Sequence, residues 1–240
     1  MKLYETGRLA AEHFLPPLYK QVRRRLLELT KPNGHYPTLL DVGGRKSPYT
    51  IGVPARITVI DLPRESEVQK SLNLGITDEI LSQIKKRRSN IEQVVLGDMT
   101  RSDLLEDSFD LVVSVEVLEH VEEDEKFVSE VIRVLKHGGT FLMTTPNGDW
   151  VENKNPDHKR HYKREQLKNL LSKYFKNVTV DYAILGGRFR TMGLKSWSVK
   201  HPLRTFSSAV GNVVNWQQSA KPKLKTQAEH TRHLIATAKN

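Results

Sequence analysis

Three short apolar runs in this chain each lead to an aspartate, and this pattern restricts the possible folds more than any other feature. The first run, Thr38-Leu39-Leu40-Asp41-Val42, is followed by the pair Gly43-Gly44, the run at 57–60 by Asp61, and the run at 94–97 by Asp98. Runs of this length are typical of buried strands, and a glycine pair lets the backbone turn closely beside a ligand. Strands that end in carboxylates predict a nucleotide-like cofactor on a doubly wound α/β sheet.

Further strands and helices continue this alternation. We expect strands at 109–114, 140–145 and 178–185, and helices at 77–88, 119–136 and 163–174. Between the first two strands, residues 46–52 are rich in turn formers and predict a turn-rich segment instead of a long helix. Strands that alternate with helices predict a mainly parallel sheet with helices on both faces.

The composition excludes several classes of protein. A chain of 240 residues can bury a full core as one domain. It contains no cysteine, which rules out disulfides, thiolate catalysis and cysteine-ligated zinc. We see no apolar signal sequence at the N-terminus, and no apolar run is long enough to span a bilayer. The expectation is a cytoplasmic protein, either free or peripheral to a membrane.

The positive charge is concentrated in one segment. The net charge is +10, and between Tyr182 and Ala228 there are eight lysines and arginines but no aspartate or glutamate. We divide the chain into an N-terminal helical arm (1–35) and a domain (36–240) that carries this basic insertion at about 188–228. The insertion also contains Trp197 and Trp216, which suits a nucleic acid, a membrane interface with a lipid-linked substrate, or a solvated lid.

Six segments together resemble the class I S-adenosylmethionine-dependent methyltransferases, and in particular the methyltransferase type 11 and ubiquinone-type O-methyltransferases. In order they are LLDVGG, ITVIDLP, VVLGDMT, FDLVVSVEVLEHV, LKHGGTFLMTTPN and HKRHYKREQL. The resemblance covers about residues 36–185. It implies a Rossmann-like α/β fold, with a seven-stranded sheet that is mostly parallel, an antiparallel last strand, and helices on both faces.

The loop after the first strand departs from the family pattern. The family has Asp-x-Gly-x-Gly-x-Gly, whereas this chain has Arg45 and Ser47 at the second and third glycine positions, and Gly44 at a variable one. The path of this loop is therefore the part of the cofactor site that the resemblance describes least well.

The resemblance implies S-adenosyl-L-methionine as the cofactor, and the residue chemistry is consistent with it. Asp61 can accept hydrogen bonds from both ribose hydroxyls, with Leu62 beside it, and Asp98 and Met99 suit the adenine amino group and ring. Gly43, Gly44 and the Ser114 backbone would lie along the amino-acid end, and Asp41 would orient the loop or meet the ammonium group through water. Taken singly, each acid could equally be a strand-end cap.

Transfer of a methyl group to a hydroxyl needs a base or a Lewis acid, because the hydroxyl pKa is high. The segment Glu116-Val117-Leu118-Glu119-His120 offers His120 as general base, and a helix would place Glu116, Glu119 and His120 on one face. The spacing also resembles metal-binding small-RNA 2′-O-methyltransferases, in which Glu116, Glu119, His120 and His158 would hold a divalent metal. Mg²⁺ suits this donor set less well than Mn²⁺ or Fe²⁺. The alternative is a helix-start feature without metal.

Three hypotheses follow. The first is a methyltransferase that acts on a hydroxyl of a small-molecule, glycan or lipid-linked acceptor. The second is an RNA ribose 2′-O-methyltransferase that uses a metal; nucleic acid is the less favoured partner, because no RNA-recognition motif is present. The third is a non-catalytic relic that binds the cofactor or a partner, for which the altered glycine loop is the only support.

Overall fold

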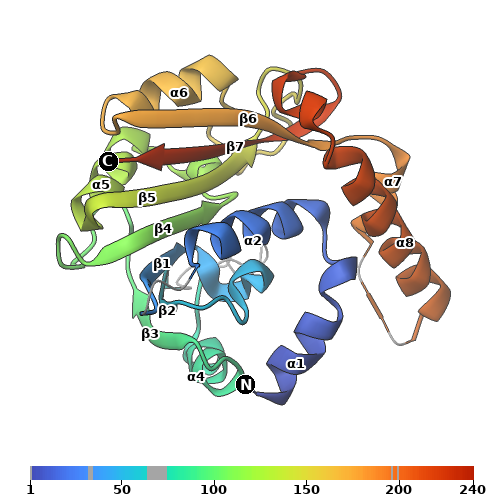
Figure 1. Cartoon of the computed structure of the whole chain (residues 1–240), viewed down its shortest axis with the longest axis horizontal. Coiled ribbons are helices and arrows are strands. Elements are labelled where there is room, and N and C mark those ends of the chain that lie inside the picture. The colour runs from blue at the N-terminus through green and yellow to red at the C-terminus, as the bar shows by residue number, and fades with distance from the viewer. Residues whose placement is uncertain (1, 32–34, 64–74, 196, 199) are drawn as a thin grey trace.

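A seven-stranded sheet forms the centre of the molecule (Figure 1). The computed structural model describes residues 2–31, 35–63, 75–195, 197–198 and 200–240. The strands are β1 (Thr38–Val42), β2 (Arg56–Asp61), β3 (Ile91–Leu96), β4 (Phe109–Val115), β5 (Leu135–Pro146), β6 (Asn177–Leu185) and β7 (Thr231–Lys239). Their order across the sheet is β3-β2-β1-β4-β5-β7-β6, and β7 runs antiparallel to both neighbours while the other pairs are parallel. The predicted Rossmann-like sheet with an antiparallel last strand is confirmed.

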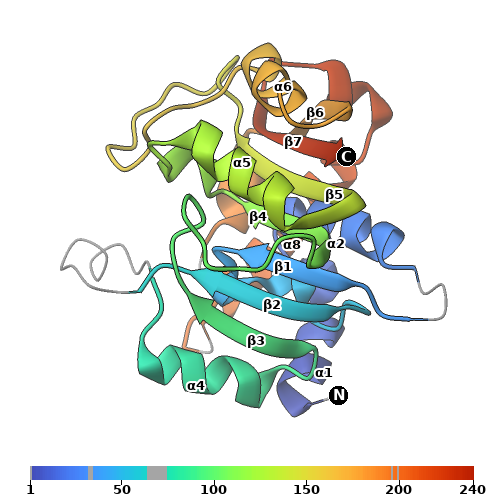
Figure 2. The ribbon, with the colours of Figure 1, turned by 90° about the vertical axis from the view of Figure 1, so that its left-hand side faces the viewer.

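Helices cover both faces of the sheet (Figure 2). The α-helices are α1 (Leu3–Ala10), α2 (Pro17–Leu29), α4 (Asp78–Arg87), α5 (Asp124–Val134), α6 (Arg164–Ser172), α7 (Arg188–Gly193) and α8 (Pro202–Ser219). Short 3₁₀ helices are η1 (Glu12–Phe14), η2 (Gly44–Lys46), η3 (Pro48–Thr50), η4 (Leu118–His120) and η5 (Pro222–Thr226). No helix in the described ranges has both the length and the apolar content needed to cross a membrane.

Alternation along β1 produces two separate cores. Leu40 and Val42 pack with α5 and α6, whereas Leu39 packs on the opposite face with Leu18, Val22 and Leu26 of α2. Because successive side chains of a strand point to opposite faces, one apolar run supplies both cores. The sheet is therefore buried on both sides, and the carboxyl ends of its parallel strands remain for binding a ligand.

The structure departs from the sequence expectations at the helix before β5. A helix was expected from 119 to 136, but η4 ends at His120, α5 runs only from Asp124 to Val134, and β5 begins at Leu135. Leu135 pairs with Phe109 of β4, so strand pairing replaces the last turn of the helix. Gly138 and Gly139, which directly follow the expected helix and His137, lie inside β5.

The basic segment lies between β6 and β7 as α7, α8 and η5. Figure 1 shows α8 along the outer margin of the molecule, on the same side as α1. α8 contacts α7, α2 and η1, so it joins the N-terminal helices to the end of β6.

Candidate functional site

The loop after β1 makes a left-handed turn and then two 3₁₀ turns. Gly43 has φ of +70°, and a Cβ on it would lie 2.7 Å from Val117 Cγ2. Both facts require glycine there, since other residues avoid this conformation and would clash. The following η2 and η3 agree with the turn-rich segment that the sequence predicts at 46–52.

Asp41 lies under this loop and is fully buried. Its carboxylate accepts hydrogen bonds from the Tyr49 hydroxyl and the Thr50 hydroxyl, each at 3.1 Å. Thr50 in turn accepts one from Arg88 Nη2 at 2.7 Å, and the charge of this buried arginine partly offsets the burial. Burial dominates and raises the pKa of Asp41 to about 6. With both oxygens engaged by the loop, Asp41 acts as its internal anchor.

Four other predicted cofactor residues lie at the ends of neighbouring strands. Asp61 ends β2, and its Oδ1 accepts a hydrogen bond from the backbone of the exposed Leu62 at 2.9 Å. Met99 is buried in the core, and Ser114 is buried near the end of β4, beside Val42 of β1.

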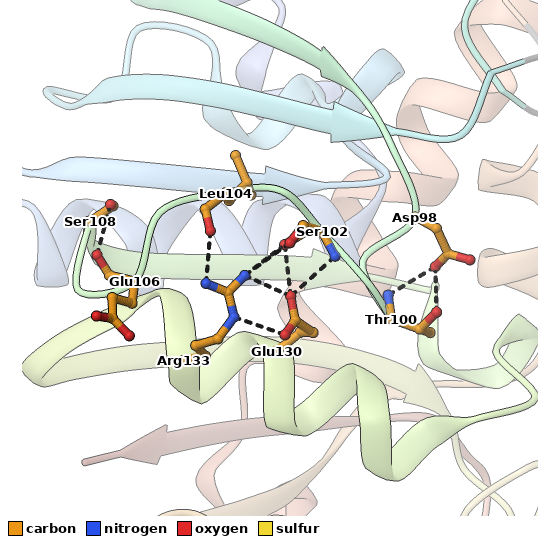
Figure 3. A network of polar contacts seen from close by, with 8 residues as sticks. All are labelled: Asp98, Thr100, Ser102, Leu104, Glu106, Ser108, Glu130 and Arg133. Carbon is orange, nitrogen blue, oxygen red and sulfur yellow. Dashed lines mark hydrogen bonds and ion pairs between the residues drawn. The ribbon is translucent and has the colours of Figure 1, made fainter.

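Asp98 belongs to a loop that is held in place from α5 (Figure 3). Its Oδ1 accepts hydrogen bonds from the backbone and hydroxyl of Thr100 at 2.8 and 2.9 Å, and its other oxygen points away from them in Figure 3. Further along, Arg133 donates to the carbonyls of Ser102 and Leu104 at 3.0 and 2.8 Å. This leaves one carboxylate oxygen of Asp98 directed to the edge of the sheet, as an adenine amino group would require.

Glu116 does not lie on a helix, so the expected helical face of Glu116, Glu119 and His120 is wrong. Its φ is +56°, the left-handed region, and η4 begins only at Leu118. Its carboxylate accepts a hydrogen bond from Thr144 at 3.0 Å and lies 3.1 Å from His233 Nδ1. Burial would raise the pKa of Glu116, but the charge of His233 and these contacts lower it overall.

Hydrogen bonds define the tautomers of three histidines in this region: His120, His158 and His161. His120 Nδ1 lies 3.1 Å from the carbonyl of Asp157, and His161 Nδ1 lies 2.9 Å from that of Val151. A carbonyl only accepts, so each Nδ1 carries hydrogen. His161 Nε2 is then an acceptor for His158 Nδ1 at 2.8 Å. In their neutral forms, His120 and His158 therefore both keep a lone pair on Nε2.

Glu119 completes a group that could hold a cation. It is fully buried, Oε2 accepts a hydrogen bond from Thr145 at 3.2 Å, and Oε1 has no partner among the described residues. Burial and the neighbouring Glu116 raise the pKa of Glu119 well above its usual range. One ligand atom from each of Glu119, His120 and His158 lies within 4.8 Å of the others, and Glu116 lies outside this group. Three of the four predicted metal ligands thus meet, with donors that fit a divalent metal.

Sequence reasoning did not select His233, which reaches the site from β7. Its ring contacts Glu116, and its Nε2 lies 3.4 Å from Arg190 of α7. The available signal was a lone histidine at the start of the apolar run of the last strand. Its partner Glu116, directly after β4, is distant in sequence and is brought near by the β4–β5 and β5–β7 pairings.

Two cavities adjoin these groups. The larger, of about 670 Å³, lies between α1, α4 and the α7–α8 segment, and reaches Arg45 and Ser47 of the loop after β1. The smaller, of about 540 Å³, is lined by Arg190, Trp150, His230 and Arg232 and adjoins the Glu116–His233 contact through Arg190. Both have the size of small-molecule sites.

Comparison with known proteins finds methyltransferases. Residues 50–143 match a methyltransferase domain family. A protein of Mycolicibacterium smegmatis described as a "probable S-adenosylmethionine-dependent methyltransferase" is 32% identical over 79 residues. The aligned stretch is 33% of this chain and 30% of that relative, so the chain spans only a minor part of the relative's length.

Solved structures share the fold over nearly the whole chain. A SAM-dependent methyltransferase from Archaeoglobus fulgidus superposes with a TM-score of 0.59 at 17% identity, and covers 92% of this chain and 94% of its own. An N-methyltransferase of Haemonchus contortus, in complex with phosphomonomethylethanolamine and S-adenosylhomocysteine, gives 0.60 at 18% identity over 98% of this chain and 57% of its own. Residues 50–143 thus carry a methyltransferase domain, and the chain has the fold of solved S-adenosylmethionine-dependent methyltransferases.

Proposed function

We propose that this chain transfers a methyl group from S-adenosylmethionine to a hydroxyl of a small-molecule, glycan or lipid-linked acceptor. The observation that carries the proposal is the arrangement of Asp61, Asp98 and His120. Asp61 ends β2, and Asp98 and His120 follow β3 and β4, which are parallel strands of the same sheet. In this fold ligands bind at that edge. S-adenosylmethionine, when bound, supplies an electrophilic methyl group.

The protein's own residues bind the cofactor and accept a proton. The carboxylates of Asp61 and Asp98 suit the ribose and the adenine amino group, and the left-handed turn at Gly43 brings backbone close to the amino-acid end. His120, with hydrogen on Nδ1, offers Nε2 to take the proton that an acceptor hydroxyl loses. The choice of oxygen as the acceptor atom is part of the proposal. The Haemonchus contortus enzyme, which has the same fold, is named as an N-methyltransferase.

The test combines binding and activity. Calorimetry with S-adenosylhomocysteine measures cofactor binding, and deuterated methyl donor followed by mass spectrometry identifies labelled acceptors in extracts. His120→Asn should lower turnover by about 100-fold or more while cofactor affinity stays within about twofold, because general-base catalysis contributes on this scale. His137→Asn, at an exposed histidine early in β5, is the matched control. Absence of S-adenosylhomocysteine binding by the wild type would favour a non-catalytic protein and overturn the proposal.

A second candidate is a metal-dependent ribose 2′-O-methyltransferase acting on RNA, and the Glu119–His120–His158 group favours it. A divalent metal such as Mn²⁺ or Mg²⁺ on these residues would act as a Lewis acid toward the ribose hydroxyls. EDTA should abolish such activity and Mn²⁺ should restore it. RNA binding should also fall steeply with salt, because a protein that follows phosphates releases counterions. An unchanged rate in EDTA excludes this candidate.

A further inference from the structure

Helix α8 has a polar inner face. Its residues that point into the protein include Ser208, Asn212, Asn215 and Ser219, all buried. Three of them donate hydrogen bonds to main-chain carbonyls: Ser208 to Gly193 at 2.9 Å, Asn212 to Phe14 at 3.0 Å and Asn215 to Leu185 at 2.8 Å. The hydroxyl of Ser219 accepts one from the Leu185 amide at 2.9 Å. This helix is fastened to the domain by hydrogen bonds rather than by an apolar stripe.

The outer face of α8 is apolar, the reverse of the usual arrangement. Leu203, Phe206 and Val210 are 84%, 70% and 37% exposed, and steps of three and four residues place them on one stripe. Leu194 and Trp197, in the connection from α7, are also exposed. We call these five residues the apolar face. The inner hydrogen bonds hold α8 without it, so the fold does not account for an apolar stripe at this position.

Cations border the apolar face. Lys195 and Lys200 lie in the same connection, and Arg204 lies in the first turn of α8; all three are exposed. The segment from Tyr182 to Ala228 contains no aspartate or glutamate. Exposed leucine, phenylalanine and tryptophan beside lysine and arginine are the composition of helices that lie in the headgroup region of anionic membranes.

We propose that the apolar face docks on an anionic membrane surface, with α8 lying in the interface plane. The apolar side chains enter the acyl boundary, and Lys195, Lys200 and Arg204 meet lipid phosphates. A second copy of the chain fits less well, because a symmetric contact would bring the same cations together. Nucleic acid also fits less well, because leucine and valine offer no ring for base stacking.

The larger cavity lies directly behind this face. Leu194 and Trp197 of the apolar face line this cavity together with the bordering Lys195, and the cavity continues to Arg45 and Ser47 in the loop after β1. Docking would therefore place a membrane next to a chamber that reaches the candidate cofactor site. If the proposed methyl transfer is correct, this arrangement selects lipid-borne acceptors among the three acceptor classes.

Vesicle co-sedimentation of the full chain tests the docking without requiring activity. We expect binding to vesicles of equal parts phosphatidylcholine and phosphatidylglycerol, and about tenfold weaker binding to phosphatidylcholine alone. The double change Leu203→Ser with Phe206→Ser should weaken binding by about tenfold or more, because two large side chains no longer enter the acyl region. Leu105→Ser, at a leucine 79% exposed in the loop before β4, is the matched control and should bind like the wild type.

Charge and assembly are measured on the same proteins. Lys195→Gln with Lys200→Gln should weaken binding to the anionic vesicles, whereas Lys86→Gln with Lys168→Gln, at exposed lysines of α4 and α6, should not. Failure of the wild type to sediment, or equal sedimentation of the Leu203/Phe206 variant, overturns the proposal. A wild-type dimer that the same double change dissociates, without vesicle binding, assigns the face to self-association and also overturns it. S-adenosylhomocysteine binding, measured in parallel, reports on the proposed function separately.

Discussion

Gly44→Ala tests whether the loop after β1 depends on direct packing against Asp41. A Cβ at Gly44 would lie 2.3 Å from Asp41 Cγ and 2.6 Å from each carboxylate oxygen. Real Cβ atoms do not approach this closely, so either the loop or the carboxylate must move. The carboxylate is fully buried and is held by Tyr49 and Thr50, so its displacement disturbs hydrogen bonds to a buried charge.

The cost follows from these contacts. Overpacking a core costs about 1–3 kcal/mol, and a hydrogen bond to a charged group contributes about 1.5–3 kcal/mol. A partial loss of both gives about 3 kcal/mol. For a chain of this length each kcal/mol lowers Tm by about 2–4 °C, so the expected decrease is about 6–12 °C. We also expect weaker S-adenosylhomocysteine binding, since the displaced loop contains Gly43.

Differential scanning calorimetry and cofactor titration supply the two measurements. Gly7→Ala in α1 is the matched control, because nothing lies within 4 Å of the added methyl group. A helical glycine replaced by alanine should raise stability by up to about 1 kcal/mol. The same chemical change should therefore have opposite signs at the two positions. A Tm for Gly44→Ala within about 2 °C of the wild type would refute the packing argument.

Three further predictions concern the same edge of the sheet. Asp61→Ala should weaken S-adenosylhomocysteine binding by about 10-fold or more in calorimetry, because it removes the acceptor for the ribose hydroxyls, and Tm should change little. Arg133→Met should destabilise by about 1–3 kcal/mol in urea unfolding, because it removes hydrogen bonds to the loop after Asp98, whereas Lys126→Met, at an exposed ion pair, should change stability by less than about 1 kcal/mol. Asp41, whose pKa is raised to about 6, stabilises the fold most below pH ~4 and loses this contribution as pH rises through 6. The unfolding free energy of Asp41→Asn relative to wild type should therefore rise by about 3 kcal/mol from pH 4 to pH 7, and a flat difference contradicts the raised pKa.

The sheet was predictable because its strands are marked in the sequence. Leu39 and Leu40 place apolar side chains on both faces of the first strand. Asp61 and Asp98 follow the next two apolar runs and so mark where those strands end. Parallel strands buried on both sides read as continuous apolar runs, so their number and order along the chain could be deduced. Their order across the sheet was not deduced from the sequence, because the family resemblance was used only for the number of strands and the antiparallel direction of the last one.

The backbone at Glu116 was not predictable in the same way. The segment to His120 has helical spacing, yet φ at Glu116 is positive, and the carboxylate turns toward Thr144 and His233. Which residue takes a left-handed conformation depends on strand pairing, since Glu116 N bonds the carbonyl of Thr144 at 3.1 Å. The spacing of residues along the chain cannot reveal a contact that depends on the pairing of β4 with β5 and of β5 with β7.

The orientation of α8 was hidden for a related reason. The sequence showed only a basic insertion here, and an apolar stripe such as Leu203, Phe206 and Val210 is ordinarily assigned to the core. Only the hydrogen bonds of Asn212 and Asn215 to distant carbonyls determine which face points inward. Polar side chains become buried where main-chain groups in the interior need hydrogen-bond partners.

The missing glycines of the loop after β1 have a physical replacement. Ser47, at a family glycine position, donates from its hydroxyl to Tyr49 at 2.8 Å, and Tyr49 donates to Asp41. Thr50 links the other carboxylate oxygen to Arg88. A flexible glycine-rich path has thus been exchanged for one fixed by buried side chains around Asp41. Glycine is still required where the backbone itself is constrained: at Gly43 by its positive φ and at Gly44 by the carboxylate beneath it. Restoring the family glycine at Ser47 would remove a buried hydrogen bond without supplying any backbone freedom that this loop uses.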